Sequence, residues 1–194
     1  MALRVLALLV FLFFGCWQTA VAHPHAGATF QRAEFFSAWS VNADGTQCAA
    51  PTAVTLNSGP VVGSIVCADN AASAFYGDMG MPDNWDGGTI TVKIHAHRAT
   101  GSGTLEFDFS AQCRGDGEVP SSTWGSAVAV STVFDTANEV EQTESAAITA
   151  AGTCAAGDHL FWRAVMDDTA TDVADVNILG VSVGFTVSDL DEVD

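Results

Sequence analysis

Five histidines are the side chains of this chain best suited to bind a metal ion. If a leader ends at Ala22, His23 becomes the mature N-terminus, and its amine and imidazole nitrogen can both bind copper. One further histidine would complete a T-shaped brace. Pro24 removes the second backbone amide, which disfavours a square-planar site built on amide nitrogens. The candidates for the third ligand are His25, His95, His97 and His159. The alternative is a flexible His-Pro-His end without a metal.

His95 and His97 are two residues apart in a predicted strand, so they share one face of it. Zinc sites that use two such histidines need a third ligand, for which His159 is the other strand candidate. The alternative is a pair of exposed polar residues. Calcium is a second candidate ion, because an acidic segment offers hard oxygen ligands, although without EF-hand spacing. Its oxygen-bearing residues, which could equally form a solvated loop, are Asp167, Asp168, Asp172, Asp175 and Asn177.

Trp85 and Trp124 lie beside glycine-rich loops, where an indole ring could stack on a sugar; either ring could equally cap the core. The chain contains no Gly-x-Ser-x-Gly, His-Glu-x-x-His or phosphate-loop motif. Its carboxylates are too numerous for the sequence to point out a glycosidase pair. We therefore expect a binding protein rather than an enzyme.

The central segment shows the clearest strand pattern of the chain. Apolar and polar residues alternate over 89–99 and again over 104–112, which predicts one buried and one wet face in each. Residues 99–103 read Ala-Thr-Gly-Ser-Gly, which is turn material. We therefore predict an antiparallel hairpin here.

Further short strands separated by turns follow this pattern, and no segment has a convincing helical period. Residues 159–166 and 177–187 alternate clearly, and the second is predicted to turn Leu179, Val181, Val183 and Phe185 inward. Residues 139–150 are expected to form an exposed strand, and residues 114–125 a long loop. The predicted fold is a single-domain, all-β antiparallel sandwich, with the jelly roll as the favoured subclass.

Residues 1–22 have the features of a secretory signal peptide: Arg4, an apolar run and a small-x-small end at Ala20-Val21-Ala22. A lipid-anchoring motif ending at Cys16 is the alternative. We expect the β-sandwich, with an N-terminal arm, over 23–187 and an acidic tail over 188–194. The mature chain is then secreted, extracellular or surface-attached, with the periplasm as another destination and no membrane span.

Four cysteines remain once the leader is removed, and in an exported chain they predict two disulfides with three connectivities. We favour Cys48 with Cys67, which closes a local loop, and Cys113 with Cys154. The formal net charge is −17, from 6 Lys and Arg against 23 Asp and Glu. Such a charge repels phosphate backbones and anionic lipid, so nucleic acid is excluded as a partner. An acidic surface favours metal ions or cationic partners over anionic ones. The alternative is that the charge serves solubility alone.

The stretch Met81-Pro82-x-x-Trp85-Asp86-Gly87-Gly88-Thr89-Ile90-Thr91 resembles a group of uncharacterised small β-proteins of tailed phages and marine bacteria. The resemblance covers roughly residues 75–186. It implies a jelly-roll-like virion or surface module and supplies no catalytic residues. The signal peptide and the cysteines depart from the group and favour an exported, host-side relative.

Two functional hypotheses remain. The first is an exported, non-enzymatic β-sandwich for adhesion, assembly or glycan binding at a cell or virion surface. Its expected partner is a glycan or a protein, and it could form a homo-oligomer. It needs no cofactor. The second is a copper-binding protein or oxidase that uses His23, whose brace resembles those of copper-dependent polysaccharide oxygenases and periplasmic copper carriers.

Overall fold

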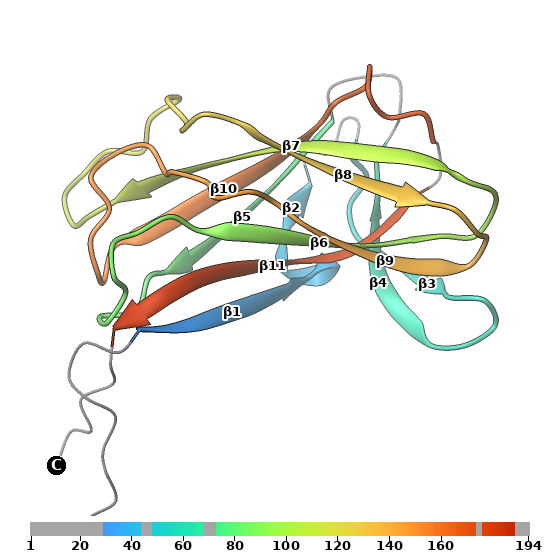
Figure 1. Cartoon of the computed structure of the whole chain (residues 1–194), viewed down its shortest axis with the longest axis horizontal. Coiled ribbons are helices and arrows are strands. Elements are labelled where there is room, and N and C mark those ends of the chain that lie inside the picture. The colour runs from blue at the N-terminus through green and yellow to red at the C-terminus, as the bar shows by residue number, and fades with distance from the viewer. Residues whose placement is uncertain (1–28, 44–47, 68–72, 174–175, 189–194) are drawn as a thin grey trace, which may run out of the picture.

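The computed structural model describes residues 29–43, 48–67, 73–173 and 176–188. Its strands form two antiparallel sheets that pack face to face (Figure 1). The first sheet has the order β3 (Thr52–Thr55), β4 (Val61–Val66), β11 (Asn177–Ser188), β6 (Thr91–Arg98) and β9 (Glu139–Glu144), and β1 (Thr29–Ser37) also pairs with β11. The second has the order β2 (Asn42–Ala43), β5 (Ala74–Gly80), β10 (His159–Met166), β7 (Gly103–Arg114) and β8 (Val128–Phe134). The prediction of an all-β antiparallel sandwich is confirmed.

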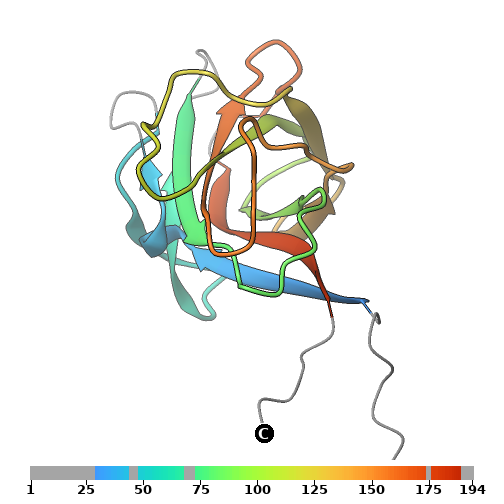
Figure 2. The same cartoon turned by 90° about the vertical axis from the view of Figure 1, so that its left-hand side faces the viewer.

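The strands β4 to β11 follow the order of a double-sheet jelly roll. Four of them lie side by side as β4-β11-β6-β9, and the other four as β5-β10-β7-β8. Figure 2 shows the two layers from the side, with the chain passing back and forth between them. The jelly-roll prediction is therefore also confirmed. A single turn of 3-10 helix, η1 (Ala38–Ser40), carries the chain from β1 in the first sheet to β2 in the second.

The predicted central hairpin is wrong, although its two strands exist. β6 pairs with β11 and β9 in the first sheet, whereas β7 pairs with β10 and β8 in the second. The turn at 99–102 therefore crosses the sandwich. Alternation decides which side of a strand faces the core. β6 and β7 both turn their apolar side toward the same core, although they belong to opposite sheets. Alternation does not decide which strands become neighbours.

The apolar faces predicted from alternation meet in one core. β6 contributes Val92, Ile94 and Ala96, and β7 contributes Leu105, Phe107, Phe109 and Ala111. Leu179 is the exception among the predicted inward residues of β11, because it is only half-buried. It lies where the register of β11 against β6 shifts, between Ile178 and Gly180. A bulge of this kind inserts one residue and re-aims its side chain.

Both predicted disulfides are present. Cys48–Cys67 joins the segment before β3 to the end of β4, and Cys113–Cys154 joins β7 to the segment before β10. The predicted leader over 1–22, with Cys16, lies outside the described residues, as do His23, His25 and positions 189–194. Over the described ranges, no helix is both long and apolar enough to cross a membrane.

Candidate functional site

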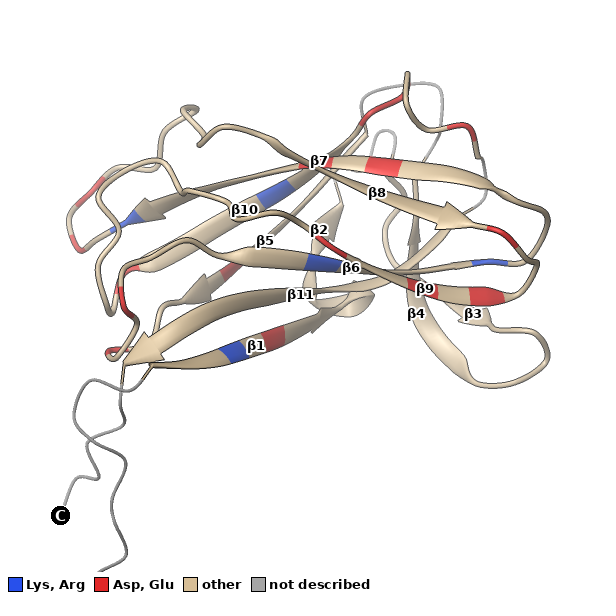
Figure 3. Ribbon diagram, in the orientation of Figure 1, with Lys and Arg blue, Asp and Glu red and all other residues tan. Residues whose placement is uncertain are grey.

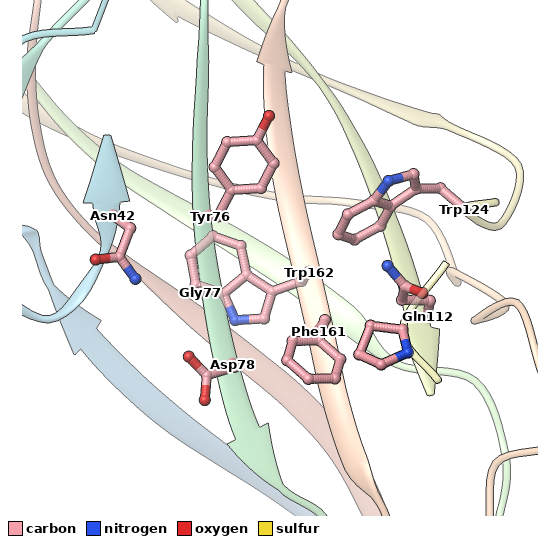
Figure 4. A pocket seen from close by; sticks show the side chains of 9 residues that line it. Asn42, Tyr76, Gly77, Asp78, Gln112, Trp124, Phe161 and Trp162 are labelled. Carbon is pink, nitrogen blue, oxygen red and sulfur yellow. The ribbon is translucent and has the colours of Figure 1, made fainter. Parts of the chain in front are cut away.

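An open pocket of about 290 Å³ lies on the solvent face of the second sheet. Alternation along β5 and β10 turns Tyr76, Asp78 and Phe161 outward, while their neighbours in the sequence enter the core. Figure 4 shows these side chains around the hollow, with Trp124 on its far side. The residues that line the pocket are Asn42, Tyr76, Gly77, Asp78, Gln112, Pro120, Trp124, Phe161 and Trp162.

Three aromatic rings from three segments form what we call the aromatic cleft: Tyr76 of β5, Phe161 of β10 and Trp124 of the loop 115–127. The ring centroids of Tyr76 and Trp124 lie 6.3 Å apart, at an interplanar angle of 45°. The guanidinium carbon of Arg163 lies 4.8 Å from the centre of the Trp124 ring, a cation–π contact that holds the indole beside β10. Arg163 is held in turn, because its Nε donates to Ser110 Oγ at 2.8 Å.

The loop that carries Trp124 is bound to β7 on both sides of the ring. Gln112 donates from Nε2 to the Ser121 carbonyl at 3.1 Å, and Arg114 donates from Nη2 to Ser121 Oγ at 2.7 Å. After Trp124, the Gly125 amide donates to the carbonyl of Ala111 at 2.9 Å. A Cβ at Gly125 would overlap the Thr149 carbonyl oxygen, so only glycine allows this close approach. The indole is therefore positioned by the fold before a ligand arrives.

The floor of the pocket depends on Gly77. This glycine lies opposite Trp162 in the β5–β10 pairing, and a Cβ at position 77 would overlap the Trp162 indole. Trp162 is fully buried and packs edge-on against Phe75 and Phe36 of the core. The absence of a side chain at position 77 thus lets one large ring support both the core and the pocket floor.

Polar groups flank the aromatic cleft. His159 and Asp78 are joined by a 2.7 Å contact between Nε2 and Oδ2, and both side chains are about half-exposed. Asn42, on β2 opposite Tyr76, and Gln112, on β7 opposite Phe161, add amide groups at the sides. The pocket thus combines apolar surfaces with a few hydrogen-bonding groups, the usual composition of a small-molecule site.

Among the residues that line this pocket, Asp78 is the only carboxylate. A glycosidase needs two carboxyl groups facing one bond. The lining therefore provides the means to bind a ligand but not the paired acid and base for this hydrolysis.

The two tryptophans predicted to bind a ligand have different positions. Trp124 lies in the pocket, whereas Trp85 is 6% exposed and belongs to the core cluster. Trp85 also forms an isolated bridge with Val187 of β11, so the Gly-rich loop beside it folds over the end of the sheet. Its ring has no free face for a sugar. Trp85 therefore caps the core, the alternative that the sequence left open.

Sequence reasoning missed Tyr76 and Phe161. Phe161 alternates with the inward residues Leu160 and Trp162, so its outward direction was readable. Several apolar side chains gathered on an exposed face signal a binding surface, whereas one outward aromatic residue does not. The joint position of Phe161, Tyr76 and Trp124 was not readable, because β5, β10 and the loop are far apart in the chain.

His95 and His97 lie on β6 in the first sheet, whereas His159 lies on β10 in the second. The three do not converge. His95 Nε2 makes a 2.8 Å hydrogen bond with Ser182 Oγ, and its ring packs edge-on against Phe35 at 5.1 Å. Burial, and then the positive charge of Lys93, lower the pKa of His95.

His97 is only 2% exposed, and neither ring nitrogen has a hydrogen-bond partner. Burial lowers its pKa as well. It is therefore not the exposed polar residue that alternation suggested. In the described part of the chain, no group of three or more His, Cys, Asp or Glu side chains could hold a metal ion. A copper site at His23 and His25 stays a prediction, since both lie outside that part.

Three of the predicted calcium ligands of the acidic segment, Asp167, Asp172 and Asn177, accept hydrogen bonds from the protein. Asp167 accepts hydrogen bonds from the Thr169 hydroxyl and from the amides of Thr169 and Ala170, which lower its pKa. Asp172 accepts from the Thr104 amide, and Asn177 accepts from Ser64 Oγ. Asp175 lies outside the described residues. The Asp172 contact ties the acidic loop to β7, and the Asn177 contact joins β11 to β4.

No protein-family model matches this chain, and no curated protein matches it. The resemblance to phage and marine β-proteins therefore stays a prediction. Among solved structures, the chain is similar to the CBM22-2 xylan-binding domain from Paenibacillus barcinonensis Xyn10C, at 11% identity over 81% of this chain and 99% of that one, with a TM-score of 0.43.

A second similar structure is CBM35 from Paenibacillus barcinonensis, at 15% identity over 81% and 98% of the two chains, with a TM-score of 0.35. A third is TmCBM61 in complex with β-1,4-galactotriose, at 11% identity over 82% and 88%, with a TM-score of 0.32. At such TM-scores these similarities decide neither fold nor function. The fold assignment rests on the strand pairing described above.

Proposed function

We propose that this protein is an exported, non-enzymatic glycan-binding β-sandwich, and that the aromatic cleft of Tyr76, Trp124 and Phe161 is its binding surface. The observation that carries the proposal is the convergence of these three rings on one open pocket, flanked by Asp78 and Gln112. Adhesion to a glycan-bearing surface is the role that suits such a protein.

The geometry suits a sugar ring because a pyranose has apolar C–H faces and a hydroxyl-rich edge. The faces can lie on aromatic rings, and the hydroxyls can pair with carboxylate and amide groups. Asp78 provides acceptors, and the amide of Asn42 provides both donors and acceptors, whereas the buried amide of Gln112 is already bonded to Ser121. The hydrogen bonds of the loop 115–127 hold Trp124 in position beforehand, which reduces the entropy lost on binding.

A neutral glycan fits better than an acidic one. The net charge of −17 repels anionic sugars at long range. Arg163, a cation beside the cleft, already lies against Trp124 and Ser110. Asp78 stands at the rim, where it would repel a uronate or sulfate group. Binding of a neutral sugar should then change little with salt concentration, since no ion pair forms.

The test is a glycan array with the secreted protein, followed by calorimetric titration with the best neutral oligosaccharide. Trp124→Ala should weaken binding at least about tenfold, since stacking rings are the usual hot spots of an interface. Trp39→Ala is the matched control, because Trp39 is 59% exposed but lies over Gly63 on the first sheet. Failure to bind any neutral glycan, or equal losses in both variants, would refute the proposal.

A further inference from the structure

The strand β1 has one edge that no described strand covers. It spans nine residues and pairs along its whole length with β11, which is its sole partner in the described part of the chain. In Figures 1 and 2 it runs along the outer margin of the fold. Seven of its nine residues are exposed. Its sequence, Thr-Phe-Gln-Arg-Ala-Glu-Phe-Phe-Ser, contains no proline and no lysine, the residues that commonly protect such edges.

The side chains of this strand have a self-complementary order. Phe30, Arg32, Glu34 and Phe36 occupy alternate positions and therefore share one face. Phe36 marks this face as the inner one, because its ring packs against Trp162 at 5.9 Å. Arg32 and Glu34 are nevertheless exposed, because β1 lies at the rim of the sandwich (Figure 3).

We propose that the edges of two β1 strands, from two copies of this chain, pair antiparallel and join the two first sheets into one continuous sheet. A two-fold axis perpendicular to the sheet keeps the inner faces of both copies on the same side. Inner residues must then stand opposite inner residues. Backbone hydrogen bonds supply affinity in such strand addition, and the side chains determine the register.

Charge selects one register among those that the axis allows. With Ala33 at the axis, Arg32 of each copy lies opposite Glu34 of the other, and Phe30 lies opposite Phe36. With Arg32 at the axis, two arginines would face each other, and with Glu34 there, two glutamates would. Opposite charges directly across a strand pair stabilise it and like charges destabilise it. The pairing centred on Ala33 therefore has two ion pairs and two aromatic pairs.

Charge reversal tests this register. The secreted wild-type protein should show a monomer–dimer equilibrium by sedimentation velocity and light scattering. Arg32→Glu and Glu34→Arg should each weaken dimerisation at least about tenfold, because each places two like-charged pairs at the interface. The double variant R32E/E34R should dimerise like the wild type. An equimolar mixture of the two single variants should form a heterodimer, which also proves that both are folded.

Asp116→Arg is the matched control for Glu34→Arg, since it makes the same charge change at an exposed loop position away from β1 and should leave the dimer intact. The proposal is overturned if the wild-type protein stays monomeric at concentrations up to about 1 mM, where even weak dimers would be detected. Dimerisation that survives both single reversals would overturn it too, and so would a failure of the mixed variants to associate.

Discussion

At the scale of single residues, His97 is the least expected feature of this protein. Its position in an alternating strand suggests a wet face, yet it is buried with two unpartnered ring nitrogens. A buried polar group without a partner costs free energy, and a charged imidazole there would cost more. His97 is thus kept neutral, and it weakens the fold when the solution becomes acidic.

This burial gives the stability a pH dependence with a definite sign. Because the folded pKa lies below the unfolded value of about 6.5, the unfolded chain takes up the extra proton first. The contribution of neutral His97 is complete above that value and is lost as pH falls through it toward the folded pKa. We expect His97→Met to be about as stable as the wild type at pH 7.5, because an apolar side chain replaces an unpartnered polar one.

At pH 5 the His97→Met variant should be the more stable of the two. Urea unfolding at both pH values measures the difference. Part of the wild-type slope should remain in the variant, because burial also lowers the pKa of His95. An unchanged stability difference between pH 7.5 and pH 5 would contradict this assignment.

At the scale of elements, the end of β7 holds the segments that surround the pocket. Ala111 accepts from the amides of both Gly125 and Ala151, and the Cys113 amide donates to the Ala151 carbonyl. The disulfide Cys113–Cys154 fastens the same strand to the segment before β10. The Trp124 loop and this disulfide therefore share one support, so the stability of this corner and the shape of the cleft are coupled.

The disulfide Cys113–Cys154 should contribute more to the free energy of unfolding than Cys48–Cys67. They span sequence separations of 41 and 19 residues, for which the chain-entropy estimate is about 4 and about 3 kcal/mol. Paired Cys→Ala variants, C113A/C154A and C48A/C67A, should lose stability in that order in urea unfolding. Weaker glycan binding is expected for C113A/C154A only. The opposite order, or equal loss of binding in both variants, would contradict the coupling.

At the scale of the whole molecule, the dominant quantity is charge. Acidic residues outnumber basic ones by 23 to 6. Figure 3 shows the few cations spread singly over β1, β6, β10 and nearby segments, with Lys93 paired to Glu144 at 3.3 Å. A surface pair of this kind adds little stability. The folded state consequently carries a large unbalanced repulsion.

Screening this repulsion should stabilise the fold. We expect the melting temperature to rise as NaCl increases from low salt to about 0.15 M, where the Debye length falls to about 8 Å, and to level off above. Scanning calorimetry measures the rise, with CaCl2 and MgCl2 compared at matched ionic strength. Equal effects of the two divalent salts fit screening alone. A larger effect of calcium would support the prediction of a calcium site in the acidic segment.

The sequence by itself determined whatever depends on local pattern. Alternation determined the faces of β6, β7 and β10, because side chains of a strand point to opposite sides in turn. The number of cysteines predicted two bridges with three possible connectivities, and the favoured one, Cys48–Cys67 with Cys113–Cys154, is the one present. The count of short strands predicted the sandwich and its jelly-roll subclass.

Only the tertiary structure decided which strands are neighbours and what lies on the solvent face. β6 and β7 follow each other in the chain yet join different sheets, because β6 pairs with β11 and β9, whereas β7 pairs with β10 and with β8, the strand that follows it. The same long-range pairing buried His97 and Trp85 and brought Tyr76 and Phe161 to Trp124. Periodicity specifies a direction for each side chain, but contact between distant segments depends on the packing free energy of the whole sandwich.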